Sequence, residues 1–223
     1  MTAPAVFVSP HLDDAVLGCG QLIGARPGAV VATLFAGSPP PSQPPTEWDA
    51  RSGFAPGDDV LGARRAEDAR ALAALGARPR WLPYRDAQYG GGAAPPLLAA
   101  AIEAVLAEFP AADVFAPLGL FHSDHVRARE AALLAARRSP EHTWTFYADG
   151  LYATLPRAVE EATAAIASRG VALAPWSPPA AAPLERKRRA IACYRSQLCA
   201  LASPGRIDAS AALAPERYWR VVR

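Results

Sequence analysis

The sequence predicts an α/β protein with a Rossmann-like, doubly wound, mostly parallel sheet and helices on both faces. Short apolar runs bounded by turn residues alternate along the chain with longer segments of helical periodicity. Polar side chains gather directly after two of these runs, where parallel sheets bind ligands. With 223 residues, of which 51% are hydrophobic, the chain can bury one sizeable core. We therefore expect a single domain over residues 1–223, with about 151–223 as a C-terminal extension packed on the Rossmann-like core.

The first predicted strand, residues 5–8, leads through the turn SPHLDD into a helix that runs to about residue 25. His11, Asp13 and Asp14 stand within four residues of this turn. Imidazole and carboxylate suit a cation such as Zn²⁺, which in catalytic sites takes three protein ligands and a water. Two of the three side chains can bind metal, and the third is left for proton transfer. The alternative is structural, because an Asp-Asp pair often caps a helix and favours its dipole.

The second predicted strand, residues 29–35, ends in a long proline-rich loop over residues 37–58. Prolines lack a backbone donor, so we expect no regular structure there. A loop of this length in a compact domain is usually functional or disordered. Because it leaves the carboxyl end of a strand, it should overhang the crevice as a lid or a substrate wall. Trp48 either stacks on a sugar ring or only pins the loop.

The next element is a helix over residues 59–75, which is expected to end at Gly76. Arg64 and Glu67 are three residues apart and share a face of this helix. One interpretation is an ion pair within the helix. The other is that Arg64 points into the site and binds substrate.

The third predicted strand, residues 80–84, is followed by a glycine-rich loop over residues 85–92. The glycines lack the Gly-Lys-Ser/Thr ending of a P-loop, so this segment is not predicted to bind phosphate in that manner. The loop again lies at a carboxyl strand end. Asp86 and Tyr89 are therefore candidate substrate contacts.

A second polar turn, FHSDH at residues 121–125, follows the fourth predicted strand at residues 113–118 and opens another helix. The chain has only four histidines, and three of them lie in the two turns. In the doubly wound strand order 3-2-1-4-5, the first and fourth strands are neighbours at the switch point where a crevice opens. That order would bring His11, Asp14 and His125 together.

The remaining elements extend the sheet and cover it. Residues 143–147 alternate polar and aromatic side chains, which predicts a fifth strand. Asp149 and Tyr152 follow its end and are candidates to line the crevice. The other expected elements are helices over residues 95–109 and 156–169, a helix to about residue 137 after the second turn, a short strand at 171–173, a linker at 175–179, a long helix to about residue 201 and a terminal strand at 218–222.

The two polar turns together resemble the hallmark of a known family, the PIG-L/LmbE-like zinc-dependent N-acetylglucosaminyl deacetylases. That family has a His-x-Asp-Asp turn after the first strand and a His-x-x-His turn further along, seen here as PHLDD and HSDH. The segment from Arg64 to Gly76 is similar to the R-x-x-E…LG helix of the family. Further similarity lies in residues 147–153, Lys187 and residues 194–197. The resemblance therefore covers most of the chain.

The resemblance implies a metal-binding set and a catalytic set. The metal ligands would be His11, Asp14 and His125. The cofactor would be Zn²⁺, with Fe²⁺ possible. Asp13 would act as general base. His122, oriented by Asp124, would stabilise the oxyanion and protonate the leaving amine.

The sequence departs from the family pattern at three positions. Leu12 stands where the commoner form has proline, and Ala15 stands where it has an acidic residue. Neither position is a metal ligand. Some members have a tyrosine two residues before the first histidine of the second motif, and here that residue is Leu120. The second oxyanion donor is therefore not identified.

The predicted function is hydrolysis of an N-acetyl or other N-acyl group on an N-acetylglucosamine-type sugar or glycoconjugate by a metal-activated water. Three alternatives stay open. One is the same chemistry on a non-sugar N-acyl substrate. The second is a metal-dependent phosphoesterase, since carboxylates and histidines also build two-metal sites. The third is a non-catalytic binding module whose polar turns only cap helices.

Composition limits the partners and the location. The net charge is only +2 and no nucleic-acid-binding module is recognisable, so no nucleic acid partner is expected. No apolar run reaches about eighteen residues, and the start MTAPAVFVSP lacks the features of a signal peptide. We therefore expect a cytoplasmic protein without a membrane span, for which a homo-oligomer is possible. The three cysteines, Cys19, Cys193 and Cys199, have no disulfide pattern and are expected to be buried thiols.

Overall fold

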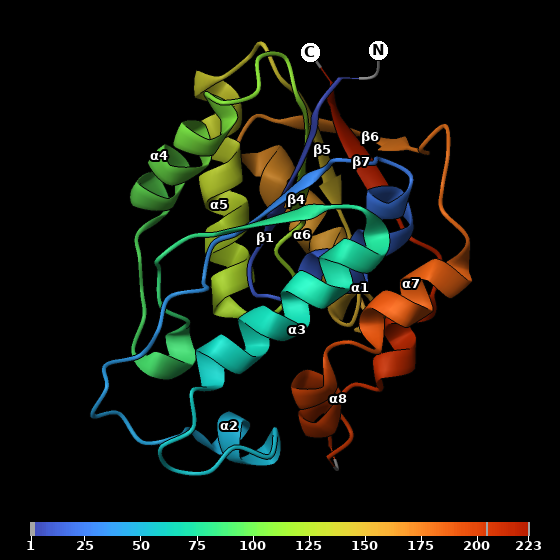
Figure 1. Ribbon diagram of the computed structural model, residues 1–223. Coiled ribbons are helices and arrows are strands. Elements are labelled where there is room, and N and C mark those ends of the chain that lie inside the picture. The colour runs from blue at the N-terminus through green and yellow to red at the C-terminus, as the bar shows by residue number, and fades with distance from the viewer. Residues whose placement is uncertain (1–2, 204, 223) are drawn as a thin grey trace.

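The computed structural model describes residues 3–203 and 205–222, which form one mixed sheet with helices on both faces (Figure 1). The strand order is β3-β2-β1-β4-β5-β7-β6, and the first five strands run parallel. The predicted fold class and the predicted order 3-2-1-4-5 are confirmed. The strands are β1 (Ala5–Ser9), β2 (Val30–Thr33), β3 (Arg78–Trp81), β4 (Asp113–Pro117), β5 (Thr143–Tyr147), β6 (Ala172–Trp176) and β7 (Tyr218–Val222).

The helices form two layers and a cap. Helices α4, α5 and α6 cover one face of the sheet and α1, α3 and α7 the other, whereas α2 and α8 lie beyond the carboxyl ends of the strands (Figure 1). The helices are α1 (Asp14–Gly24), α2 (Glu47–Arg51), α3 (Val60–Leu75), α4 (Pro95–Leu106), α5 (Ser123–Arg138), α6 (Ala158–Ser168), α7 (Leu184–Ile191) and α8 (Arg195–Leu201). Short 3-10 turns occur at Ala87–Tyr89, Tyr152–Thr154 and Ala209–Leu213. No helix among the described residues is both long and apolar enough to cross a membrane.

The core is divided between the two faces of the sheet because side chains alternate along each strand. Val6 and Val8 of β1 face the α4–α6 layer, whereas Phe7 faces α1, α3 and α7. Phe7 stacks on Phe115 of β4 with ring centroids 4.6 Å apart. Each fully buried aromatic side chain of this kind stabilises the fold by about 2 kcal/mol relative to an exposed one. The central strands are therefore rigid supports for the turns that follow them.

Helix α2 lies inside the segment that we expected to be an irregular loop, so that expectation was wrong for these residues. Its start is a capping box: the Thr46 hydroxyl accepts from the Asp49 N–H, and the Asp49 carboxylate accepts from the Thr46 N–H. Local side-chain hydrogen bonds of this type satisfy the free donors of a helix start. The predicted end of α3 at Gly76 is confirmed, where the backbone has φ 72°.

The expected long helix to about residue 201 is instead two helices, α7 and α8. The chain leaves helical geometry at Tyr194, whose hydroxyl donates to the buried Asp68 at 2.8 Å. Glu67 then accepts from the Ser196 N–H at 2.9 Å and from its hydroxyl at 2.6 Å. These contacts across the fold offset the helical bonds lost at the break. Of the three cysteines, all free, only Cys19 is buried, whereas Cys193 is half-buried and Cys199 is exposed, so the expectation of buried thiols was wrong for the last two.

The C-terminal strand β7 lies between β5 and β6 and is antiparallel to both. Glu216, just before it, reaches across to α1, where the non-helical backbone of Cys19 interrupts the helix. Its carboxylate accepts from the N–H groups of Gln21 at 2.8 Å and Leu22 at 3.2 Å. The buried Lys187 amine donates to the same carboxylate at 2.8 Å. The end of the chain thus caps a break in its first helix.

Candidate active site

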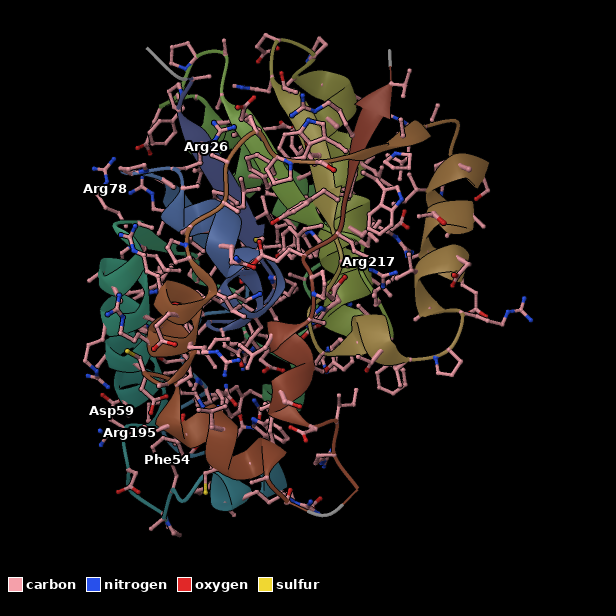
Figure 2. All side chains as sticks on the ribbon, turned by 90° about the vertical axis from the view of Figure 1, so that its right-hand side faces the viewer. Arg26, Phe54, Asp59, Arg78, Arg195 and Arg217 are labelled. Atoms are coloured by element: carbon pink, nitrogen blue, oxygen red, sulfur yellow. The ribbon has the colours of Figure 1, made fainter. Side chains whose placement is uncertain are left out.

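Both polar turns lie at the carboxyl end of the sheet, at the switch point. β1 and β4 are parallel neighbours, with Val6 beside Val114 in the register. The turn after β1 enters α1, and the turn after β4 enters α5. A cavity of about 240 Å³ opens between them, as expected for this edge of a doubly wound sheet. Nearby, Figure 2 shows Phe54, Asp59 and Arg195 gathered around α2, the start of α3 and α8.

His11, Asp14 and His125 meet at the floor of this cavity. Oδ2 of Asp14 lies 3.1 Å from Nδ1 of His11 and 3.1 Å from Nε2 of His125. One ligand atom from each residue lies within 4.8 Å of the others. Two imidazole nitrogens and one carboxylate oxygen are a donor set suited to a divalent metal ion with an open position. The three residues therefore fit such an ion.

His125 is held in place by Asp149. Nδ1 of His125 lies 2.5 Å from Oδ1 of Asp149, and Oδ2 accepts from the N–H groups of Gly119 at 3.0 Å and Leu120 at 3.3 Å. This arrangement directs Nε2 of His125 toward Asp14, as carboxylate partners of metal-binding histidines do. Asp149 was expected to line the crevice, but it is buried behind His125 and does not line the cavity.

Asp13 lines the cavity next to this set without sharing its contacts. Its side chain caps nothing at the start of α1, which removes the structural alternative for this residue. The side chain is 8% exposed. Burial, and then the negative charge of Asp14, raise the pKa of Asp13 to about 7. A carboxylate with a pKa near neutrality can accept and release a proton at neutral pH.

The contacts of Asp124 differ from those that the resemblance implied. Its carboxylate lies 3.3 Å from Nε2 of His11 and accepts from the Ala87 N–H at 2.9 Å and from Arg127 at 2.5 Å. It does not contact the ring of His122. Instead, the Asp124 N–H donates to Nδ1 of His122 at 3.2 Å, which makes His122 the N-cap of α5. Asp124 is drawn away because the backbone and Arg127 offer it stronger donors.

His122 lines the cavity as a neutral ring rather than as a cation. Burial, and then the proximity of His11, lower the pKa of His122. Because Nδ1 accepts a hydrogen bond, the proton of the neutral ring is on Nε2. His11, His122 and Asp124 form a second possible metal set, but it shares His11 with the first. The described residues therefore do not offer two independent metal sites.

Three of the candidate substrate contacts line the cavity: Trp48, Asp86 and Tyr152. Asp86 lies 3.6 Å from Nε2 of His11. The Tyr152 ring packs edge-on against His125, with centroids 5.1 Å apart. Both interpretations of Trp48 apply, because it faces the cavity while its Nε1–H donates to Gln197 at 2.8 Å.

Arg64 and Tyr89 do not line this cavity, so the structure does not support them as substrate contacts. Arg64 is 3% exposed, and its Nη1 lies 2.9 Å from the Asp49 carboxylate, which also accepts from the Tyr89 hydroxyl at 2.8 Å. The alternative pairing of Arg64 with Glu67 was wrong too, since Glu67 binds Ser196. The buried Asp49 of α2 draws both predicted residues into a network beneath the proline-rich segment.

Five residues of the cavity wall were not predicted as site residues. They are Gln88, Leu151, Gln197, Leu201 and Arg206. Gln88 lies between Asp86 and Tyr89, which were predicted as substrate contacts. Gln197 is the last residue of the segment 194–197 that carried part of the resemblance. Leu151 lies in the segment 147–153 that carried another part of the resemblance. Leu201 and Arg206 had no signal in the sequence. Their positions depend on the break between α7 and α8, which folds the later chain over the strand ends.

The fold and the donor set define a class of protein, the metal-dependent hydrolases built on a doubly wound sheet. Residues 6–136 match the family model described as PIG-L: GlcNAc-PI de-N-acetylase. The chain belongs to the PIG-L family and is an N-deacetylase, a hydrolase. A comparison with curated proteins finds no match.

Several solved structures with the same fold are deacetylases. The A40926 pseudoaglycone deacetylase Dbv21 is 29% identical, with a TM-score of 0.78 over 99% of this chain and 98% of that chain. A triple mutant of a deacetylase from the teicoplanin biosynthetic pathway is 26% identical, with a TM-score of 0.78 and the same coverage. The zinc-inhibited form of the teicoplanin deacetylase Orf2, at 24% identity and a TM-score of 0.79, over 99% of this chain and 98% of that chain, shows the shared fold.

Proposed function

We propose that this protein removes the N-acetyl group from an N-acetylglucosamine unit of a larger glycoconjugate, with Zn²⁺ or Fe²⁺ held by His11, Asp14 and His125. The observation that carries the proposal is the convergence of these three side chains beside a carboxylate, Asp13, that is not part of the set. A metal bound there would lower the pKa of a water molecule and polarise the acetamide carbonyl.

Asp13 is the proposed general base. Its pKa of about 7 lets the carboxylate take a proton from the attacking water at neutral pH. The same group can return that proton to the departing amine, because a pKa near neutrality makes both transfers feasible. This role needs no second carboxylate, in keeping with the engagement of Asp124 elsewhere.

His122 is the proposed donor to the developing oxyanion. Its Nδ1 accepts from the Asp124 backbone, so its Nε2 carries a hydrogen that can point to the substrate. A neutral imidazole donor of this kind stabilises negative charge as it forms. This replaces the protonated His122 expected from the sequence. Asp124 acts through its contact with His11 and, by its backbone, through His122.

The glycoconjugate is proposed from the cavity and the neighbours together. Trp48 offers an apolar face and Asp86 an acceptor for sugar hydroxyls within a cavity of about 240 Å³. One neighbour is a pseudoaglycone deacetylase, and another solved structure is that of a deacetylase-teicoplanin complex. A cytoplasmic location and a homo-oligomer stay predictions.

The test is metal content and acetate release, measured on protein purified without a metal-affinity tag. We expect about one Zn or Fe per chain, lost in His11→Ala, and acetate release from N-acetylglucosamine conjugates by the wild type alone. Acyl amino acids and phosphate esters serve as competing substrates. Preferential hydrolysis of acyl amino acids, or phosphate release with two metals per chain, would contradict the proposed activity on an N-acetylated sugar.

A further inference from the structure

The first turn of α1, residues 14–18, packs directly against the segment that follows β5. Asp14 opens this turn, and Gly18 stands four residues later on the same face of the helix. The helical backbone is interrupted at the next residue, Cys19, where φ is −145° and ψ is 32°. The rest of the helix therefore does not by itself fix the position of the turn that carries Asp14. That position also depends on what the turn packs against.

Two glycines make this contact. A Cβ atom on Gly150 would lie 2.5 Å from the Leu17 carbonyl oxygen and 3.1 Å from the Gly18 nitrogen. A Cβ atom on Gly18 would lie 2.9 Å from Cδ2 of Tyr147 and 3.0 Å from the Ala148 carbonyl oxygen. Neither glycine has a positive φ. The close approach of the two segments, rather than the backbone conformation, therefore requires glycine at both positions.

The contact joins the two halves of the metal-binding set. Asp14 begins the turn on one side of it. On the other side, Gly150 directly follows Asp149, whose carboxylate lies 2.5 Å from Nδ1 of His125. The opposite nitrogen of that ring, Nε2, lies 3.1 Å from the Asp14 carboxylate. A change in the distance between the two glycines would therefore change the spacing of the two ligands.

The size of that change decides whether a metal ion would sense it. Ordinary carbon–oxygen contacts in proteins are about 3.3 Å or longer. Alanine at position 150, with its Cβ only 2.5 Å from a backbone oxygen, would therefore push the turn and the segment apart by about half an ångström or more. Bond lengths at metal sites vary by only about 0.2 Å. The displacement is larger than the site can absorb.

We propose that Gly18 and Gly150 are positioning residues of the metal site, and that their contact sets the spacing between Asp14 and His125. The inference rests on the metal-binding set of the proposed function and adds two residues that hold its halves in register. The two glycines line a neighbouring cavity of about 220 Å³ and not the active-site cavity. They act through Asp14 and through Asp149, and they touch neither metal nor substrate.

The experiment measures the affinity of metal-free protein for Zn²⁺ in competition with a chromogenic chelator. Gly150→Ala should weaken binding by about 10- to 100-fold, as changes to residues that orient metal ligands do. Gly18→Ala should weaken it less, because its Cβ would have more room. Gly24→Ala is the matched control, since its Cβ would lie 2.8 Å from Cβ of Ala182, in the same helix but away from the site. All three variants should melt at a lower temperature, but only the first two should lose affinity.

The absorption spectrum of bound Co²⁺ gives a second readout that a loss of stability alone would not move, because it depends on ligand geometry. We expect an altered spectrum for Gly18→Ala and the wild-type spectrum for Gly24→Ala. Equal affinities and equal spectra in these two variants would overturn the inference and leave the proposed function intact. This pair decides the matter even if Gly150→Ala does not fold. A wild type that binds no metal would refute the proposed function and the inference together.

Discussion

The floor and the roof of the active-site cavity are built in opposite ways. The floor consists of two short turns after β1 and β4, whose polar side chains are neighbours in sequence. The roof consists of α2 and α8 with the segments around them, held by contacts between residues far apart in the chain. Trp48 binds Gln197, and Glu67 binds Ser196. Local sequence therefore sets the chemistry, whereas long-range hydrogen bonds set what can enter.

The largest expected effect comes from changing the floor alone. Asp13→Asn should reduce kcat by about 10³-fold, because it removes the proton acceptor without changing the side-chain volume. Metal content and the melting temperature should stay near the wild-type values, since Asp13 shares none of the contacts of the metal-binding set. Loss of metal in this variant would make Asp13 a ligand and contradict the assignment.

The next largest effect is expected from a change in the roof and concerns stability rather than catalysis. Arg64→Met should lower the free energy of unfolding by about 3–5 kcal/mol, because it leaves the buried Asp49 carboxylate without its cation. Urea denaturation measures this loss. The double variant with Asp49→Asn should recover part of the stability, since no charge then stays buried. Additive effects of the two changes would show that the pair is not coupled.

A pH experiment tests the hydrogen bonds of Asp68, which connect the roof to the core. Burial raises the pKa of this carboxyl to about 7, while it accepts hydrogen bonds from Trp81 and Tyr194. In the unfolded chain its pKa is about 4. Between about pH 4 and pH 7 the folded state binds one more proton than the unfolded state does, at the Asp68 carboxyl. The stabilisation that this proton provides is therefore complete below about pH 4 and is lost as the pH rises to about 7.

Asp68→Asn should remove that pH dependence. The amide is always neutral and can still pair with both partners, so the variant should exceed the wild type in stability at pH 8 by at most about 4 kcal/mol. The difference should shrink toward pH 4. Urea denaturation at several pH values measures it, and a wild-type stability that rises from pH 5 to 7 relative to the variant would contradict the assignment.

The smallest effect is expected at the contact between the two roof helices. Gln197→Leu removes the acceptor of the Trp48 indole N–H, which loosens one wall of the cavity. We expect a loss of about 1 kcal/mol in substrate binding, seen mainly as a several-fold higher KM. A change confined to kcat would place Gln197 in the chemical step instead.

The same contrast explains how much the sequence could predict. The strand order and the convergence of His11, Asp14 and His125 followed from periodicity and from the switch-point rule, because turns after neighbouring parallel strands must meet. The break before α8 could not be predicted, since it depends on Asp68 and Glu67, more than a hundred residues earlier. Without the break, nothing in the sequence places Arg206 or Leu201 at the site.

The misassigned side chains share a physical cause. Tyr89 and Asp149 were expected at the crevice because they follow the carboxyl ends of strands, and Arg64 was considered because its helix face could be directed into the site. The structure uses them one layer further in, where Asp149 orients His125 and Arg64 neutralises Asp49. Sequence position gives the edge of the sheet on which a residue lies. It does not give how far the side chain lies below the protein surface, because that depends on which buried polar partner needs it for a hydrogen bond or an ion pair.

The hydrogen bonds from Glu216 to the first helix bear on how this chain can vary in evolution. The family match ends at residue 136. The helix that begins at Asp14 is nevertheless capped by the carboxylate of Glu216, which lies eighty residues beyond the end of that match. A recombination event that exchanged the last third of the chain would therefore disturb the metal-binding turn. The two parts of the chain therefore depend on each other for their local structure.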